Sequence, residues 1–197
     1  GIDTEKFWLE NFDEETKRTE LGITKNDLMI LSVGELNKNK NQEVIIRAIA
    51  KLNDSRIHYF IAGRGDKEEY LRNLAKSLGV NLQLLGYRTD IIELLNIADI
   101  FALPSLREGL SVALMEAMSA GLPCIVSRIR GNVDLIEEGK SGYLCEPDDV
   151  DGFKNRIGEL MFKSKKKTEF SKFNRERITF FDIKKINDKM KLIYFCK

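Results

Sequence analysis

Short apolar runs alternate with helical segments along this chain, and that alternation limits its fold more than any other feature. The first run, LMILSVG at residues 28–34, is of strand length and ends in glycine, which is typical of a strand buried on both faces of a parallel sheet. Residues 41–53 follow with apolar side chains three and four positions apart, the spacing of a helix with one buried face. Such strand and helix units build parallel sheets.

The same alternation continues along the chain to residue 145. The expected strands are 28–34, 57–63, 81–86, 99–105, 123–127 and 142–145, and the expected helices are 41–53, 67–79, 89–98, 111–120 and 132–138. The chain from residue 148 on is expected to be helical. We therefore predict an α/β fold, a Rossmann-like doubly wound parallel sheet of about six strands with helices on both faces. Residues 1–197 are expected to form one domain.

Charge and cysteine content narrow the classes of function. The formal net charge of +1 gives no general attraction to nucleic acid. From residue 160 on there are 12 Lys or Arg against 4 Asp or Glu, either a solvated helix face or a surface that rests on anionic lipid. Three separated cysteines without a C-x-x-C pair argue against a zinc site and for a reducing compartment. The single histidine, His58, lies in an apolar run, which argues against catalysis by a histidine. We expect a cytoplasmic protein without a metal, at the inner face of the membrane if the tail binds lipid.

Glycines stand at several expected strand ends, where open parallel sheets bind their ligands. Gly34 ends the first strand, and Gly63, Arg64 and Gly65 follow the second. Glycine permits positive φ and close approach of a ligand to the backbone, although glycine also ends strands for no functional reason. The second turn is therefore either a plain turn or a phosphate loop. Glu68 occupies the place of the third glycine in the dinucleotide fingerprint, which excludes that motif.

Three cations follow expected strands and could face the same ligand. Lys40 lies between the first strand and its helix, where a lysine can reach a phosphate. The alternative is that Lys40 is a solvated loop residue beside Lys38. Arg64 and Arg88, at the ends of the second and third strands, could add positive charge near the same site.

The stretch REGLSVALMEAMSAGLPCIV, residues 107–126, carries the strongest signal for a site. A helix is expected to begin near Ser111, and Gly109 leaves the space before it free of a side chain. The N–H groups of Leu110, Ser111 and Val112 would then lack helical acceptors. A diphosphate fits that place without a metal ion, since the positive end of the helix dipole faces it.

Two carboxylates flank this helix start. Glu108 precedes it and can accept hydrogen bonds from sugar hydroxyls. Glu116 lies five residues past Ser111, about 7.5 Å along the helix axis, which suits a ribose on the far side of the diphosphate. Alternatively, Glu116 is an exposed helix residue, or the two acids are a glycosidase pair, whose carboxyl groups are ~5–9 Å apart. The apolar neighbours of Glu116 favour a partner for its carboxylate.

Several motifs occur in an order that resembles a known family. They are SVGELNKNK, IAGRGD, LLGYRTDI, ADIFALPSLREGLSVALMEAMSAGLPCIVS, GNVDLI and GKSGYLCEPDD. Together they resemble the retaining GT-B glycosyltransferases of family 4, which include capsule, lipopolysaccharide and exopolysaccharide enzymes. The resemblance covers nearly the whole chain. Its most specific part is the pair Glu108 and Glu116, with seven residues between them.

This resemblance implies a reaction. A hexose would pass from a nucleoside diphosphate sugar, such as a UDP-sugar, to a glycan or lipid-linked acceptor in surface polysaccharide synthesis, with retained configuration and without a further cofactor. Glu108 is implied as the catalytic residue that holds the donor sugar, and Glu116 as the residue that holds the ribose. A diphosphate oxygen would help to deprotonate the incoming hydroxyl. Nucleic acid is not an expected partner.

The resemblance also places the remaining donor contacts. Lys40 matches the phosphate-binding lysine, the backbone of residues 109–111 matches the groups that bind sugar and diphosphate, and Tyr87 and Arg88 occupy the segment near the nucleobase. One residue departs from the pattern, because Glu35 stands where the family usually has a second phosphate-binding arginine. Another cation would have to compensate, or Glu35 would serve the acceptor side.

The resemblance extends to both ends of the chain. Residues 1–12 are similar to the linker after the first Rossmann domain of the family, and residues 178–197 to the helices that return to that domain. The chain is therefore expected to be the donor-binding half, without the N-terminal acceptor domain, and to transfer sugar poorly or not at all. The alternatives are a non-catalytic nucleotide-binding or assembly module, which Glu35 supports, and a non-hydrolysing sugar-nucleotide epimerase.

Overall fold

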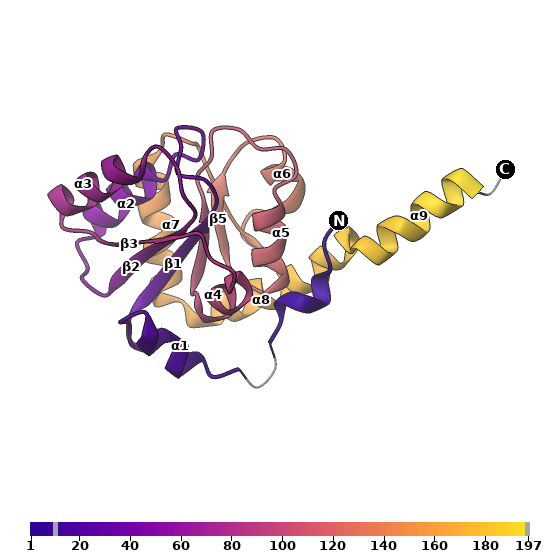
Figure 1. The fold of residues 1–197 in the computed structure, drawn as a ribbon, viewed down its shortest axis with the longest axis horizontal. Coiled ribbons are helices and arrows are strands. Elements are labelled where there is room, and N and C mark those ends of the chain that lie inside the picture. Colours follow the sequence, from indigo (N-terminus) through magenta and orange to yellow (C-terminus); the bar gives the residue numbers. More distant parts are fainter. Residues whose placement is uncertain (10–11, 196–197) are drawn as a thin grey trace.

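The computed structural model describes residues 1–9 and 12–195, and within them six strands form one parallel sheet (Figure 1). The strands are β1 (Leu28–Val33), β2 (Ile57–Ala62), β3 (Asn81–Gly86), β4 (Ile100–Leu103), β5 (Cys124–Ser127) and β6 (Gly142–Cys145). Their order in the sheet is β3-β2-β1-β4-β5-β6, and each neighbouring pair is parallel. The predicted doubly wound fold is confirmed.

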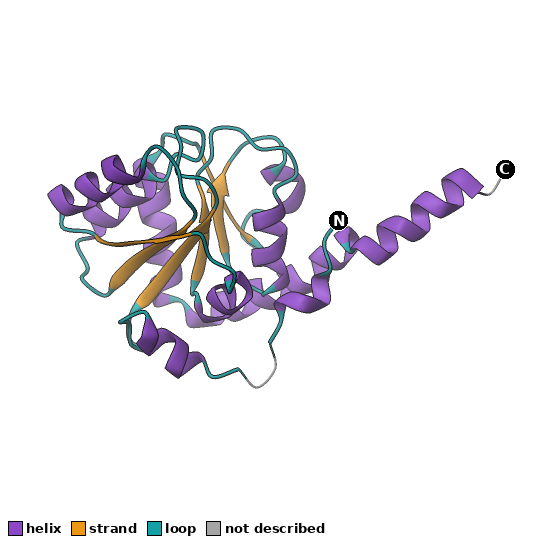
Figure 2. Cartoon of the chain, in the orientation of Figure 1, coloured by secondary structure: helices purple, strands orange, loops and turns teal. Residues whose placement is uncertain are grey.

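Helices cover both faces of this sheet (Figure 2). The helices of the described residues are η1 (Thr4–Phe7), α1 (Glu14–Glu20), α2 (Glu43–Leu52), α3 (Glu68–Leu78), α4 (Ile91–Ile97), α5 (Val112–Ser119), α6 (Asn132–Leu135), α7 (Val150–Phe162), α8 (Ser164–Ile178), η2 (Thr179–Phe181) and α9 (Ile183–Phe195). Helices α4 and α5 pack on one face, and α2, α3 and α7 pack on the other.

Strand β1 shows why its sequence is continuously apolar. Met29 and Leu31 belong to the core under α4 and α5, whereas Leu28 and Ile30 belong to the core under α2 and α7. Successive side chains of a strand point to opposite faces, so a strand with a core on each side needs apolar residues throughout. This placement also puts the end of β1 at the centre of the sheet.

Two helical predictions differ from the structure. The helix expected at 132–138 ends at Leu135, because Ile136 is extended and Glu138 pairs with Gly142 in a short bridge. The helical region expected from residue 148 on is interrupted at Lys163, where α7 ends and α8 begins. Helix α1 was not predicted, although Asp13 caps it by accepting a hydrogen bond from the N–H of Thr16 at 3.0 Å.

The first residues of the chain lie against the segment that leads into α9, beside α5. Ile2 forms a parallel bridge with Asp182, and the Asp182 carboxylate accepts a hydrogen bond from the Thr4 hydroxyl at 2.8 Å. Helix α9 then projects away from the body (Figure 1). The linker and the return helix stay predictions, and parts of both, residues 10–11 and 196–197, lie outside the described residues. In the described part of the chain, no helix is long and apolar enough to cross a bilayer.

Candidate functional site

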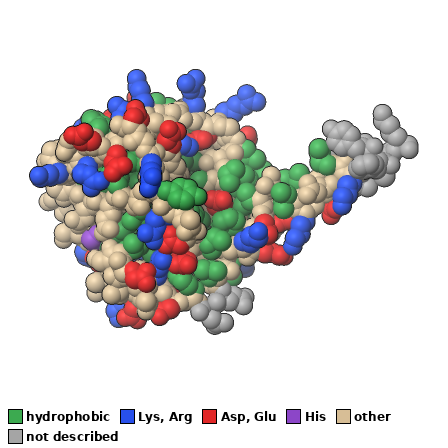
Figure 3. Space-filling model, in the orientation of Figure 1, with side chains coloured by type: hydrophobic (Ala, Val, Ile, Leu, Met, Phe, Trp, Pro, Cys, Tyr) green, Lys and Arg blue, Asp and Glu red, His purple; other side chains and the backbone are tan. Residues whose placement is uncertain are grey.

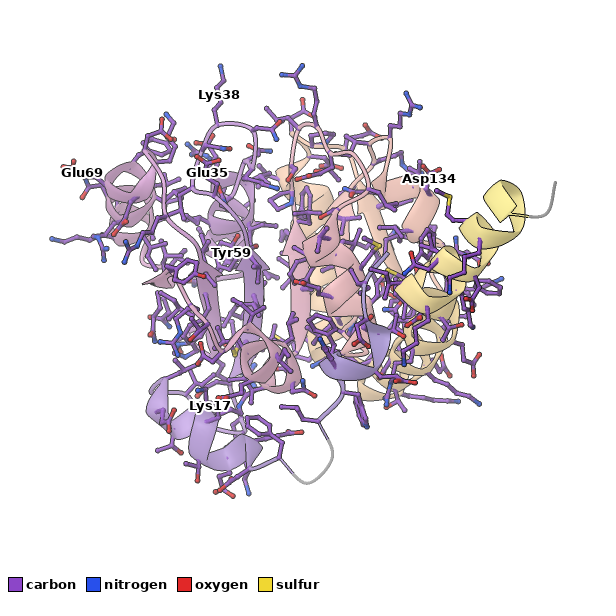
Figure 4. The ribbon with its side chains drawn as sticks, turned by 45° about the vertical axis from the view of Figure 1, so that its right-hand side comes forward. Lys17, Glu35, Lys38, Tyr59, Glu69 and Asp134 are labelled. Carbon is purple, nitrogen blue, oxygen red and sulfur yellow. The ribbon has the colours of Figure 1, made fainter. Side chains whose placement is uncertain are left out.

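The site lies where β1 and β4 end, side by side, at the carboxyl edge of the sheet. Helix α2 leaves toward one face and α5 toward the other, which creates the kind of crevice in which doubly wound sheets bind ligands. Lys38 and Glu35, in the loop after β1, lie along this edge (Figure 4). Basic side chains project from the same edge (Figure 3).

The loops after β1 and β4 are fastened together. The Leu106 N–H donates to the Asn39 carbonyl at 2.7 Å, and the Asn39 amide donates to the Arg107 carbonyl at 2.9 Å. Asn41, held at a φ of 53°, donates to the carbonyl of Pro104 at 3.2 Å. These contacts fix the two sides of the site relative to each other before any ligand binds.

The first turn of α5 matches its prediction. Ser111 is the N-cap, and its hydroxyl accepts a hydrogen bond from the Leu114 N–H at 3.4 Å. Within the described residues, the N–H groups of Leu110, Ser111 and Val112 have no protein acceptor. Three donors at the positive end of a helix are therefore open to an anion.

Lys40 and Glu108 form an ion pair across the crevice. The Lys40 Nζ lies 2.6 Å from the Glu108 Oε1, and the two side chains are 21% and 13% exposed. Gly34 lies directly beneath, since a Cβ at this position would be 3.3 Å from the Lys40 Cε. The structure thus brings together three residues that the sequence analysis selected from two separate segments.

Glu116 lies on α5, more than one helical turn past the N-cap residue Ser111. Its side chain is half-buried, and burial raises its pKa above the ordinary value. Among the described residues its carboxylate has no hydrogen-bond donor and no cation as partner. A half-buried carboxylate without a partner is uncommon in folded proteins, so the surface beside α5 is suited to a ligand that supplies hydroxyl groups.

Gly63 and Gly65 have a packing role in this structure. A Cβ at Gly63 would lie 1.9 Å from the Gly34 carbonyl oxygen, and one at Gly65 would lie 2.2 Å from the Leu36 oxygen. These contacts account for both glycines through the close approach of two loops, and a phosphate contact stays a prediction. Arg64 is exposed, close to Gly86.

Tyr87 and Arg88, the two ligand contacts expected in the segment after β3, lie in different surroundings. Tyr87 is 74% exposed and is free to cover a planar ligand. The Arg88 guanidinium is bound by Asp90, with 2.7 Å between Nε and Oδ1, and Asp90 also contacts the Lys17 Nζ at 2.8 Å. Arg88 and Lys17 together hold the pKa of Asp90 far below its usual range. Arg88 therefore has its charge balanced within the protein, whereas Arg64 has no acidic partner among the described residues.

Two buried hydroxyls at this edge belong to residues that the sequence placed at strand ends but did not single out as donor contacts. The hydroxyls of Ser105 and Ser127 are buried just past β4 and at the end of β5, without a partner in the described residues. A serine that follows a buried apolar run was the available signal.

In the described part of the chain, no group of three or more His, Cys, Asp or Glu side chains is arranged to hold a metal ion. Asp149 caps α7, and Asp151 binds Lys51 at 2.8 Å.

Comparison with known families decides the assignment. The sequence profile of the family described as glycosyl transferases group 1 matches residues 13–177. The chain belongs to this family. The match spans the whole sheet and every residue of the site described above, and it confirms the family expected from the motifs.

One curated relative and one solved structure agree with this assignment, the first in sequence and the second in fold. The chain is 35% identical, over 204 residues, to the UDP-Gal:alpha-D-GlcNAc-diphosphoundecaprenol alpha-1,3-galactosyltransferase of Escherichia coli, covering 98% of this chain and 52% of that protein. HepE of Anabaena, solved in complex with UDP, superposes with a TM-score of 0.93 at 23% identity, over 100% of this chain and 56% of HepE. The chain spans about half the length of these relatives.

A shorter structure matches over its full length. The C-terminal domain of a group 1 glycosyltransferase, LpcC of Francisella tularensis, has a TM-score of 0.80 at 19% identity, over 93% of this chain and 100% of that domain. At these identities the likeness concerns the fold. It agrees with the doubly wound sheet derived from the strand order.

Proposed function

We propose that this chain is the donor-binding part of a retaining glycosyltransferase that transfers a hexose from a nucleoside diphosphate sugar. The observation that carries the proposal is the start of α5, where open N–H groups lie between Glu108 and the half-buried Glu116. An anion and two hydroxyl-bearing rings, one on each side, match this arrangement. Sugar, diphosphate and ribose occur in that order in a nucleotide sugar.

Each group then has a chemical task. The diphosphate lies on the first turn of α5 and Lys40 neutralises part of its charge, which stabilises the leaving group as the bond from the sugar carbon to the phosphate oxygen breaks. Glu108 accepts hydrogen bonds from the sugar, and Glu116 from the ribose. The acceptor oxygen bonds to the same sugar carbon on the same face, and its proton passes to a diphosphate oxygen. Exposed Lys38 and Arg107, without acidic partners among the described residues, add to the positive edge.

Two similar proteins support a UDP-hexose as the donor class. The name of the Escherichia coli relative includes a UDP-galactose donor and a lipid-diphosphate acceptor, and HepE has been solved with UDP and with UDP-glucose. We propose that the acceptor is a glycan or lipid-linked sugar in surface polysaccharide synthesis on the cytoplasmic face of a membrane. Its contacts would come from a domain outside this chain.

A thermal-shift panel tests the proposal with UDP, GDP, ADP and their glucose derivatives. A ligand present at about 100 times its Kd should stabilise the fold by about 2.7 kcal/mol. Replacing Glu116 by alanine should remove the preference for UDP over inorganic pyrophosphate, because the ribose loses its acceptor. Glu69→Ala, which removes an exposed acid on α3, is the matched control. Failure of every nucleotide to stabilise the protein, or an inverted product from the longer parent enzyme, would refute the proposal.

A second candidate is a non-catalytic nucleotide-binding module. Glu35 favours it, because its carboxylate stands exposed beside the phosphate site and accepts a hydrogen bond from the Asn37 amide at 2.9 Å. A carboxylate there cannot supply a second positive charge to the diphosphate. A single-turnover assay of the longer parent with UDP-glucose and an acceptor separates the candidates, since the module would bind the donor without forming product.

A further inference from the structure

The two charged groups expected to hold the donor hold each other in this structure. Lys40 is proposed to bind the phosphates of the donor, and Glu108 is proposed to accept hydrogen bonds from its sugar. In this structure, however, the Lys40 Nζ lies 2.6 Å from the Glu108 Oε1. Neither side chain is more than 21% exposed. An ion pair with this little solvent is screened less than a surface pair, so it has to be broken or rearranged at a real cost when a ligand enters.

The surrounding backbone holds the pair in place. Lys40 follows Asn39, whose backbone and side chain are both bonded to the loop that carries Glu108. The stem of Lys40 also runs over Gly34, where a side chain would press on it. Because both partners are anchored, a ligand cannot simply push the two loops apart, and it competes for the charged groups themselves.

Competition of this kind affects ligands unequally. Bare UDP brings a diphosphate that needs the Lys40 charge, but it brings nothing to replace Lys40 as the partner of Glu108. It therefore leaves a carboxylate close to its own phosphates, and like charges repel. A nucleotide sugar brings hydroxyl groups that donate to Glu108, so the carboxylate exchanges one partner for another.

From this geometry we infer that the Lys40 to Glu108 ion pair sets selectivity for the sugar-bearing donor over the bare nucleoside diphosphate. The inference rests on the proposed function and adds a role for Glu108 beyond contact with the sugar. Glu108 weakens binding of the product nucleoside diphosphate, because it pairs with Lys40, the cation that would bind the phosphates. In turnover this would speed the release of the diphosphate once the sugar has left.

Calorimetric titration of this chain with UDP and UDP-glucose tests the inference. Glu108→Gln keeps the size and an acceptor oxygen but removes the charge that holds Lys40. We expect it to bind UDP about tenfold more tightly than the unmodified chain, and to lose most of the preference for UDP-glucose, since a charged hydrogen bond no longer has to be broken. Removal of an ordinary ligand-binding residue would change UDP affinity in the opposite direction or not at all.

Three further variants complete the test. Glu35→Gln removes a negative charge from the same edge without touching Lys40, and should change UDP affinity by less than about twofold. Lys40→Gln should weaken binding of both UDP and UDP-glucose. In the Lys40→Gln background, Glu108→Gln should tighten UDP by much less than tenfold, because the carboxylate no longer competes for the lysine and only its repulsion of the phosphates is removed. Thermal unfolding of each variant checks that it is folded.

The outcomes separate this inference from the proposed function. If the unmodified chain binds UDP and UDP-glucose but Glu108→Gln does not tighten UDP, the competition is refuted and donor binding stands. The same holds if Glu35→Gln tightens UDP as much as Glu108→Gln, since the effect would then be general electrostatics. If no protein in the set binds either nucleotide, the proposed function and the inference both fail.

Discussion

At the scale of single residues, Glu116 is a residue whose proposed role in ligand binding lowers the stability of the folded protein. Helix α5 is otherwise made of apolar and small residues, and a carboxylate in that surface loses hydration without gaining a partner. Burial raises its pKa for that reason. An acid with a perturbed pKa beside a ligand crevice is a candidate functional group. The raised pKa of Glu116, its position on α5 and the open N–H groups nearby all favour a role in ligand binding.

Glu116 should make stability depend on pH in a defined direction. Because its pKa in the folded protein lies above the ordinary value of 4.5, the folded state keeps a proton that the unfolded chain has already released. Stability must then fall as pH rises from about 4.5 through the folded pKa. Replacing Glu116 by glutamine removes this loss, so the difference in unfolding free energy between the variant and the unmodified chain should grow across that range.

Urea denaturation at several pH values measures this difference without ligand. Glu69→Gln, which neutralises an exposed acid on α3, supplies the baseline for loss of one charge. If the Glu116→Gln advantage is constant from pH 4 to pH 8, the carboxylate is not perturbed by burial and the argument for its role weakens.

At the scale of elements, the start of α5 depends on α6. Gly131 precedes α6 at a φ of 86°, and a Cβ there would lie 2.0 Å from the Gly109 carbonyl oxygen. Gly109 leads into the first turn of α5, where the open N–H groups lie. The loop before α6 therefore supports the site from behind without contributing a side chain to it.

Gly131→Ala should damage both stability and UDP binding. A backbone held at this positive φ costs about 1–3 kcal/mol for a residue with a Cβ, and the clash with Gly109 adds to that cost and displaces the start of α5. Gly139→Ala is the matched control, because Gly139 has a φ of 76° but no atom within 4 Å of its Cβ position. It should show the backbone cost alone, with unchanged UDP affinity. Equal effects of the two variants would mean that the loop contact does not support the site.

At the scale of the whole molecule, local patterns predicted more than long-range contacts did. The apolar runs predicted the strands, and Ser111 predicted the start of α5, because burial of a strand and capping of a helix depend on a few neighbouring residues. The contact between Lys17 and Asp90, the acid that binds Arg88, joins residues 73 positions apart and was not predictable, and neither was the packing of Gly63 on Gly34. Such contacts depend on how distant segments meet.

One long-range contact fixes the first segment to the body. The Arg175 guanidinium of α8 lies 3.6 Å from the centre of the Trp8 ring, and its NH2 group donates to the Ser171 hydroxyl at 2.8 Å. Burial lowers the pKa of Arg175. Cation and ring contacts of this kind contribute about 0.5–2 kcal/mol, enough to hold a short segment in place.

Arg175→Met should loosen this segment while keeping an apolar stem. We expect unfolding free energy to fall by about 1 kcal/mol. Trp8 is the single tryptophan of the chain, so its fluorescence should shift to longer wavelength as the ring loses its cover. Lys172→Met, an equal loss of charge at an exposed position on α8, should leave the emission unchanged. An unshifted spectrum in Arg175→Met would show that the ring contact does not cover Trp8.

The bridge between Ile2 and Asp182 gives these outer segments a common attachment. No strand of the sheet crosses that point, and α9 starts immediately after it. A rotation of α9 about this bridge would therefore displace the residues next to Ile2, and the contact of Trp8 with Arg175 would limit how far along the chain that displacement reaches.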